Sequence, residues 1–189
     1  ESRFAVVQVT EAVPGTWEIN LHGDVIISGE YHAWLPMTGF ISPDVEFTAP
    51  TPNYTIVIPS TSQGVLSVGA YNSRENSLYI NSSWGPTIGS KISPDFVAPG
   101  VNVSGFYPIG MGNMTGTSVS AAIAAGASAL MFQWALVEEN SPTMTGNRLR
   151  TVLIRGSSRD ENRQYPNPQW GYGKLNLMQT FNLFREEYL

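Results

Sequence analysis

The stretch Gly116-Thr117-Ser118-Val119-Ser120-Ala121-Ala122-Ile123-Ala124 decides how this chain is interpreted. A Gly-Thr-Ser turn leads directly into small and apolar residues that continue to Leu136, which predicts a helix from Ser118 to about Glu138. A hydroxyl at a helix start lies beside N–H groups that have no intrahelical partner, where partial positive charge favours an oxyanion. Two interpretations stay open: an ordinary N-cap on a core helix, or a nucleophilic serine beside its oxyanion donors.

Four other segments favour the second interpretation by their order around this turn. They are Val65–Tyr71 (VLSVGAY), Ser82–Pro86 (SSWGP), Ser93–Val101 (SPDFVAPGV) and Trp170–Asn176 (WGYGKLN). Together with the Gly-Thr-Ser turn they resemble the C-terminal half of the subtilisin-like serine proteases (peptidase S8), from about Thr55 to Leu183. The resemblance implies an α/β fold: part of a doubly wound, mostly parallel sheet with flanking helices.

The same resemblance implies a role for the Gly-Thr-Ser turn in hydrolysis of a peptide bond through an acyl-enzyme. Ser118 would be the nucleophile and its backbone N–H one oxyanion donor, with a hydroxyl contact from Thr117 near the same position. Most members carry Pro and then His at the positions of Ala122 and Ile123. Pro in the first turn of a helix costs nothing, so Ala is sterically mild there, and we interpret the change as a subfamily feature.

The family's other catalytic groups have no counterpart in this sequence. The triad runs Asp, His, Ser along the chain, and neither the Asp-(Ser/Thr)-Gly nor the His-Gly-Thr-His segment occurs. The two histidines, His22 and His32, have the wrong neighbours, and Asn53 and Asn72 do not match the oxyanion-hole Asn. We therefore expect the C-terminal piece of a longer protease, inactive by itself, whose partner is the N-terminal half of the same protease.

Residues 1–50 differ in pattern from residues 51–189. Short β-branched and aromatic runs separated by Gly and Pro predict antiparallel strands at Phe4–Val9, Thr16–Leu21, Val25–Ile27 and Tyr31–Leu35. This part resembles the end of the jelly-roll insertion of the clostridial Csp-type members. We expect residues 1–50 to be the end of that insertion and a crossover, and residues 51–189 to be the C-terminal half of the catalytic domain. The same resemblance implies a secreted or spore-associated bacterial protein.

Composition narrows the function classes. A net charge of −5 argues against nucleic acid or an anionic membrane as the main partner. The absence of Cys excludes a disulfide framework and a thiolate metal site, and no run of 18 apolar residues predicts a membrane span. We expect no cofactor and no metal; Asp160-Glu161 is more simply a solvated pair of acids than a calcium site. Besides a protein or peptide substrate for the intact protease, two alternatives stay open: a pseudoprotease that serves as a binding or signalling scaffold, and a stand-alone binding module.

The remaining elements follow from periodicity. Buried parallel strands are expected at Thr55–Ile58 and Val65–Val68, and helices at Asn147–Arg155 and Leu175–Leu183. In the helix after Ser118, we expect the small residues to lie against the sheet, while Leu130, Met131 and Trp134 fill space further out. These small residues are Ala121, Ala122, Ala125, Gly126 and Ala129. The arginines Arg148, Arg150 and Arg155 are expected to be solvated.

Overall fold

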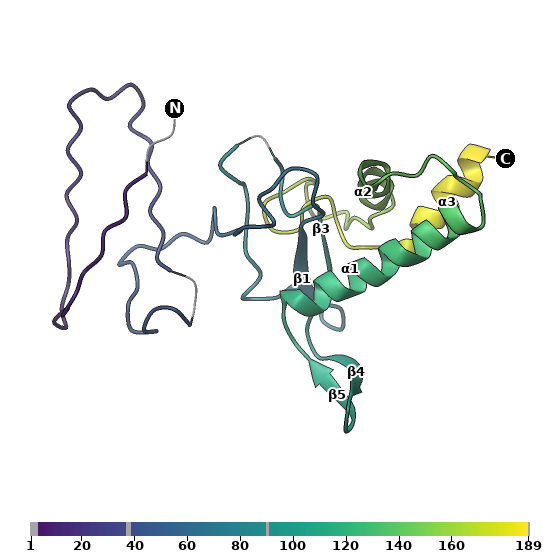
Figure 1. Ribbon diagram of the computed structural model, residues 1–189, viewed down its shortest axis with the longest axis horizontal. Coiled ribbons are helices and arrows are strands. Elements are labelled where there is room, and N and C mark those ends of the chain that lie inside the picture. Colours follow the sequence, from purple (N-terminus) through teal and green to yellow (C-terminus); the bar gives the residue numbers. More distant parts are fainter. Residues whose placement is uncertain (1–3, 37–38, 90, 189) are drawn as a thin grey trace. The chain divides into compact units, whose positions relative to one another are not determined.

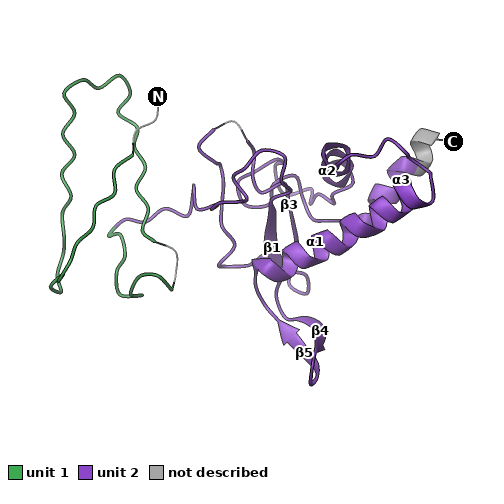
Figure 2. Cartoon of the chain, in the orientation of Figure 1, with its two compact units in different colours: residues 1–48 green, residues 49–189 purple. Residues whose placement is uncertain are grey.

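The computed structural model describes residues 4–36, 39–89 and 91–188. The chain divides into two compact units, unit 1 (Glu1–Thr48) and unit 2 (Ala49–Leu189), coloured separately in Figure 2. The ends of the two expected domains, residues 1–3 and 189, lie outside the described part. The assignment of the first unit to a jelly-roll insertion stays a prediction.

Unit 1 contains no helix or strand among its described residues (Figure 1). The four strands expected between Phe4 and Leu35 are therefore absent, and this prediction is wrong for the chain as it stands. The apolar side chains that prompted it are exposed, for example Phe4 (93%) and Ile27 (99%). A strand is stabilised by cross-strand neighbours and by burial of one face, and residues 4–36 and 39–48 form no such covering.

Unit 2 is built on a three-stranded sheet of order β2-β1-β3. β1 (Val68–Asn72) pairs in parallel with β3 (Phe96–Pro99), and antiparallel with the short β2 (Ser77–Leu78). The register places Val68 opposite Phe96 and Ala70 opposite Ala98. β3 lies at the edge in this order, yet it is almost wholly buried, and isolated bridges join its Phe96 to Gly171 and its Val97 to Lys174.

The sheet begins later than the sequence indicated. β1 starts at Val68 instead of Val65, and Thr55–Ile58 runs as irregular chain held at Thr55 by the backbone of Trp84 (Thr55 N to Trp84 O 3.1 Å). Apolar runs of this length do not distinguish strands from extended loop segments. A separate hairpin of β4 (Val103–Tyr107) and β5 (Gly110–Met114) leads from the sheet to the helix that carries Ser118.

That helix, α1 (Thr117–Phe132), continues into a π-helical turn, η1 (Gln133–Val137). Together they span the helix predicted from Ser118 to about Glu138; the π-helical turn was not predicted. It packs on β1 and β3, but not through the expected face. Its buried side chains are Ser120, Ala124, Ala127 and Met131, followed by Ala135 in η1. The residues expected to face the sheet are exposed: Ala121, Ala122, Ala125, Gly126 and Ala129. Since this helix is apolar on all sides, periodicity did not distinguish its inner face from its outer one.

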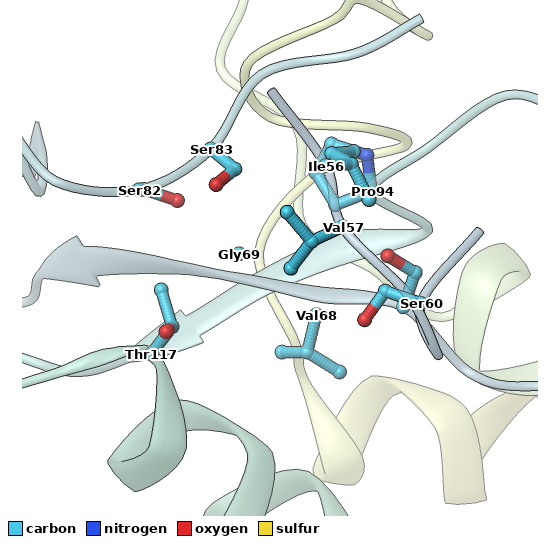
Figure 3. Close-up of a pocket in the computed structure, with 10 residues that line it drawn as sticks. Ile56, Val57, Ser60, Val68, Gly69, Ser82, Ser83, Pro94 and Thr117 are labelled. Carbon is cyan, nitrogen blue, oxygen red and sulfur yellow. The ribbon is translucent and has the colours of Figure 1, made fainter. Parts of the chain in front are cut away.

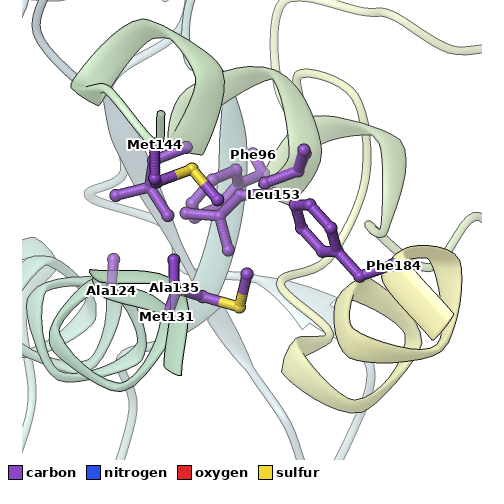
Figure 4. Close-up of a cluster of buried hydrophobic side chains, with 9 residues drawn as sticks. Phe96, Ala124, Met131, Ala135, Met144, Leu153 and Phe184 are labelled. Carbon is purple, nitrogen blue, oxygen red and sulfur yellow. The ribbon is translucent and has the colours of Figure 1, made fainter. Parts of the chain in front are cut away.

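The core of unit 2 lies between α1 and two further helices (Figure 4). α2 (Gly146–Arg155) begins at Thr145, whose side chain accepts a hydrogen bond from the backbone of Arg148, and α3 (Leu177–Tyr188) packs beside it. Phe96, Met131, Leu153 and Phe184 meet at their contact, each 2% exposed or less. The mixed α/β fold class is confirmed.

The segment Thr117–Val137 has the length and the mean hydropathy, 1.5, of a membrane-crossing helix. About a quarter of its 18-residue window (28%) is buried inside the structure. Core helices of soluble proteins meet the same criteria, so this is weak evidence for a membrane span.

Candidate functional site

Ser118 is the second residue of α1 and its side chain is exposed. The helix starts abruptly because Gly116 has a φ of 150°, a conformation that side chains disfavour. The carbonyl of Gly116 accepts from the backbone of Val119 (3.1 Å), and its N–H donates to Gly100 after β3 (2.8 Å). The N–H groups of Thr117 and Ser118 lie in the first turn, where α-helical geometry supplies no acceptor.

Ser120 fixes the helix start against the sheet. Its hydroxyl is fully buried and donates to the carbonyls of Ala98 (2.9 Å) and Pro99 (3.1 Å) at the end of β3. Position 100 requires glycine, because a Cβ there would lie 2.3 Å from the Ser120 Oγ. Two serines two residues apart therefore differ in role: Ser120 is an anchor and Ser118 is accessible.

A pocket opens beside Thr117, the residue before Ser118 (Figure 3). It encloses about 410 Å³, part of it open to solvent. Its lining is wholly uncharged: Ile56, Val57, Ser60, Ser67, Val68, Gly69, Ser82, Ser83, Pro94 and Thr117. The structure thus brings Thr117 together with hydroxyl and apolar groups from the segment before β1 and from the loop after β2.

Unit 2 contains no histidine, since the chain's two histidines are His22 and His32 of unit 1. His22 is exposed, and the His32 ring stacks on Trp34 at 5.5 Å between centroids. Asn53 and Asn72 take part in local turns, Asn53 with Thr51 and Asn72 with the backbone of Arg74. The site that unit 2 forms around Ser118 therefore has no imidazole of its own.

The first of the two aspartates in unit 2 is Asp95, which is fully buried. It accepts from the Ser67 backbone N–H (2.8 Å) and from Arg150, whose guanidinium approaches to 2.5 Å. The expectation that Arg150 is solvated is wrong: it links α2 to the sheet. The hydrogen bond that Arg150 donates to Asp95 raises the pKa of Arg150 and outweighs the effect of burial. Asp95 is thus committed to a structural ion pair.

The second aspartate, Asp160, is also engaged, against the expectation of a solvated acid. Its carboxylate binds Lys174 Nζ (2.5 Å), Arg163 and the amide of Asn76. The hydrogen bond from Lys174 is the main reason why the pKa of Asp160 lies below its ordinary value. Among the described residues no three His, Cys, Asp or Glu side chains gather as metal ligands do.

One positioning group escaped the sequence analysis. The Lys91 Nζ donates hydrogen bonds to three backbone carbonyls, those of Ser60 (2.9 Å), Ser62 (2.8 Å) and Val65 (3.2 Å). Burial lowers the pKa of Lys91, an effect that the charge of Asp95 opposes. The sequence around Lys91 could not predict these contacts, because the carbonyls lie 26 to 31 residues away along the chain.

Comparison with solved structures places this fold among proteases. The CspB protease of Clostridium perfringens is 36% identical, with a TM-score of 0.71, and the match covers 75% of this chain but 31% of CspB. The PatG macrocyclase solved with a peptide is 25% identical (TM-score 0.55; 67% of this chain, 38% of PatG). The self-cleaved protease domain of PatA, 23% identical (TM-score 0.57; 71% and 47%), shows the fold alone.

The chain thus spans less than a third of the length of CspB. Comparison with curated proteins gives no match. A sequence model of the subtilase family (Peptidase S8) matches residues 47–173, which contain the sheet, the hairpin, Ser118 and most of the core. The chain belongs to the subtilase family.

Proposed function

We propose that Ser118 is the nucleophile of a serine endopeptidase whose catalytic His and Asp are supplied by residues outside this chain. The observation that carries the proposal is the accessible Ser118 hydroxyl at the start of α1, beside N–H groups free of intrahelical acceptors. Donors of this kind are what the oxyanion of a tetrahedral intermediate requires, which supports the proposal. Thr117, on the same turn, adds a hydroxyl near that position.

The proposed reaction proceeds in two halves. The Ser118 Oγ attacks the scissile carbonyl carbon while the His takes the hydroxyl proton, and the tetrahedral intermediate expels the amine, which leaves with that proton. Water then hydrolyses the Ser118 ester by the same route and releases the acid. Within unit 2, Asp95 and Asp160 are engaged in their ion pairs, so neither serves as the aspartate that orients the His.

The substrate is a peptide or protein segment that places an uncharged side chain in the pocket beside Thr117. The ten lining residues carry no charge, and burying a charged side chain there without a partner would be unfavourable. The peptide bound to the related PatG macrocyclase supports this class of ligand.

The exposed face of α1 supports a partner that completes the enzyme. Ala121, Ala125 and Ala129 lie exposed on it, with Leu130 at 53% and, in the following η1, Val137 at 76%. No charged residue occurs between Asp95 and Glu138. An uncovered apolar helix face of this kind is a surface for protein contact, and we assign it to the part of the protease that supplies the His and Asp. This chain alone is therefore inactive.

Labelling with a fluorophosphonate tests the proposal. The intact parent protein is treated with the probe, and the labelled peptide is identified by mass spectrometry. We expect label on Ser118, lost in Ser118→Ala and retained in Ser128→Ala, a partly buried serine of the same helix. If the folded parent protein takes no label on Ser118, the proposed enzymatic function is overturned. A scaffold protein that keeps the fold without catalysis is then favoured.

A further inference from the structure

We infer that the Lys91 ammonium acts as a built-in cation that shapes the substrate pocket, by holding the turn segment Ile58–Val65 against the loop after β2. Three carbonyls of that segment converge on the single Nζ atom, from Ser60, Ser62 and Val65, at 2.8–3.2 Å. An ammonium group has three N–H donors, so each donor has one acceptor. The arrangement resembles carbonyl coordination of a small cation, with the cation covalently part of the protein.

The held segment contributes Ser60 to the lining of the pocket. The Ser60 carbonyl accepts a hydrogen bond from Lys91, and Ser60 forms one wall of the pocket together with Ile56 and Val57, which lie just before the segment (Figure 3). The segment has no strand partner, and its residues 58–65 run as turns and bends. Turns that have no strand-to-strand hydrogen bonds depend on side-chain contacts for their position. The hydrogen bonds from Lys91 therefore determine the position of this part of the pocket lining.

The chain on each side of the segment is anchored independently of Lys91. At Thr55, the backbone N–H donates to the Trp84 carbonyl (3.1 Å) and the side chain accepts from the Trp84 N–H (2.9 Å). At Ser67, the backbone exchanges hydrogen bonds with Asp95 in both directions. Removing the ammonium would therefore loosen the segment and leave the chain on each side of it in place.

Lys91 is itself held in position. Its carbonyl accepts a hydrogen bond from the Thr87 hydroxyl (2.9 Å), and Thr87 is 7% exposed. The charged groups that act on the ammonium are Asp95 and Arg150, and these two neutralise each other in their ion pair. Carbonyl dipoles thus supply the partners of Lys91, which makes it a positioning residue for the pocket wall.

The test compares Lys91→Ala with wild type in the intact parent protein by hydrogen exchange. We expect amide exchange across residues 58–65 to rise by about tenfold or more, because charge-assisted hydrogen bonds are lost, while β3 and α1 keep their protection. Arg74→Gln, which removes an exposed cation, serves as the control and should change nothing in this segment. Unchanged exchange at residues 58–65 in Lys91→Ala would overturn the inference.

Chemical rescue separates a cation role from simple packing. Ammonium chloride should restore protection in Lys91→Ala, whereas tetramethylammonium chloride, which has no N–H donor, should not. Equal effects of the two salts would contradict the inference. Should Lys91→Ala fail to fold, Thr87→Val releases the Lys91 loop more mildly and is expected to raise exchange in the same segment; no rise there would also overturn it.

The consequence for substrate rests on the proposed function. If Ser118 reacts with the fluorophosphonate, Lys91→Ala should raise KM for a peptide substrate several-fold and leave kcat nearly unchanged, since the wall binds and does not react. A fall in kcat with unchanged KM would contradict a pocket role. The exchange and rescue results do not depend on catalysis, so they stand even if Ser118 proves inert.

Discussion

The two units of this chain have comparable apolar patterning and opposite outcomes. In unit 2, Phe96 and Leu153 are fully buried, whereas in unit 1 Phe4 and Ile27 are almost fully exposed. In unit 2, residues of β3, α1, α2 and α3 from distant parts of the sequence share one core, but the described residues of unit 1 contain no second layer. Apolar alternation is therefore insufficient for a strand without a face to cover it.

The most disruptive expected change removes a core side chain of unit 2. Phe96→Ala should lower the free energy of unfolding by about 3–5 kcal/mol, because it leaves a cavity at the contact of β3 with the helices. Ile27→Ala in unit 1 should change it by less than about 0.5 kcal/mol. Urea unfolding followed by far-UV circular dichroism measures both. Similar losses for the two variants would show that unit 1 is covered in solution.

The buried ion pair tests how far unit 2 depends on contacts remote in sequence. Arg150→Met should cost about 3 kcal/mol, since it leaves the buried Asp95 carboxylate without its cation. Arg148→Met on the same helix, whose guanidinium binds the Thr143 hydroxyl at an exposed position, should cost under about 1 kcal/mol. Adding Asp95→Asn to Arg150→Met should recover part of the loss. Equal costs for the two arginines would refute the structural role of Asp95.

A smaller effect distinguishes the two serines at the start of α1. Ser120→Ala should destabilise unit 2 by about 1–2 kcal/mol, because the carbonyls of Ala98 and Pro99 lose their buried donor. Ser118→Ala should leave the melting temperature unchanged and abolish labelling. Scanning calorimetry of both variants measures the melting temperatures that distinguish the two roles. A destabilised Ser118→Ala would mean that Ser118 also has a structural role.

The smallest expected effect concerns pH. The pKa of Asp160 is lowered from its ordinary 3.8 in the folded protein, chiefly by Lys174, so folding favours its charged form. Its contribution is present above pH 3.8 and is lost as the pH falls through the lower folded-state pKa. In Asp160→Asn, the free energy of unfolding should therefore fall less steeply as the pH is lowered into the acid range. Lys174→Met should show a smaller change in the same direction. An unchanged pH dependence in Asp160→Asn would contradict this.

Much of unit 2 could be predicted because its helices depend on local signals. The three helices α1, α2 and α3 all begin within about two residues of their expected starts, although α3 continues to Tyr188 instead of ending at Leu183. The subtilase resemblance is confirmed by the family match. Ser118 and Thr117 as site residues stay predictions, although the structure places Ser118 exposed and Thr117 at a pocket.

Other features could not be predicted because they depend on residues far apart in the chain. The inner face of α1 was misassigned, since only the position of β1 and β3 distinguishes one side of an all-apolar helix from the other. Arg150 meets Asp95 across 55 residues, and Lys91 meets Ser60 across 31. A local window contains neither partner.

The sequence by itself therefore determined the family, the helix that begins beside Ser118, and the absence of a histidine from residues 49–189, because motif order, capping and composition are local properties. The tertiary structure alone decided which serine is anchored and which is accessible, that both aspartates of unit 2 are engaged, and that Lys91 holds the pocket wall. Burial and ion pairing are relations between distant segments, and they exist only once the chain has folded.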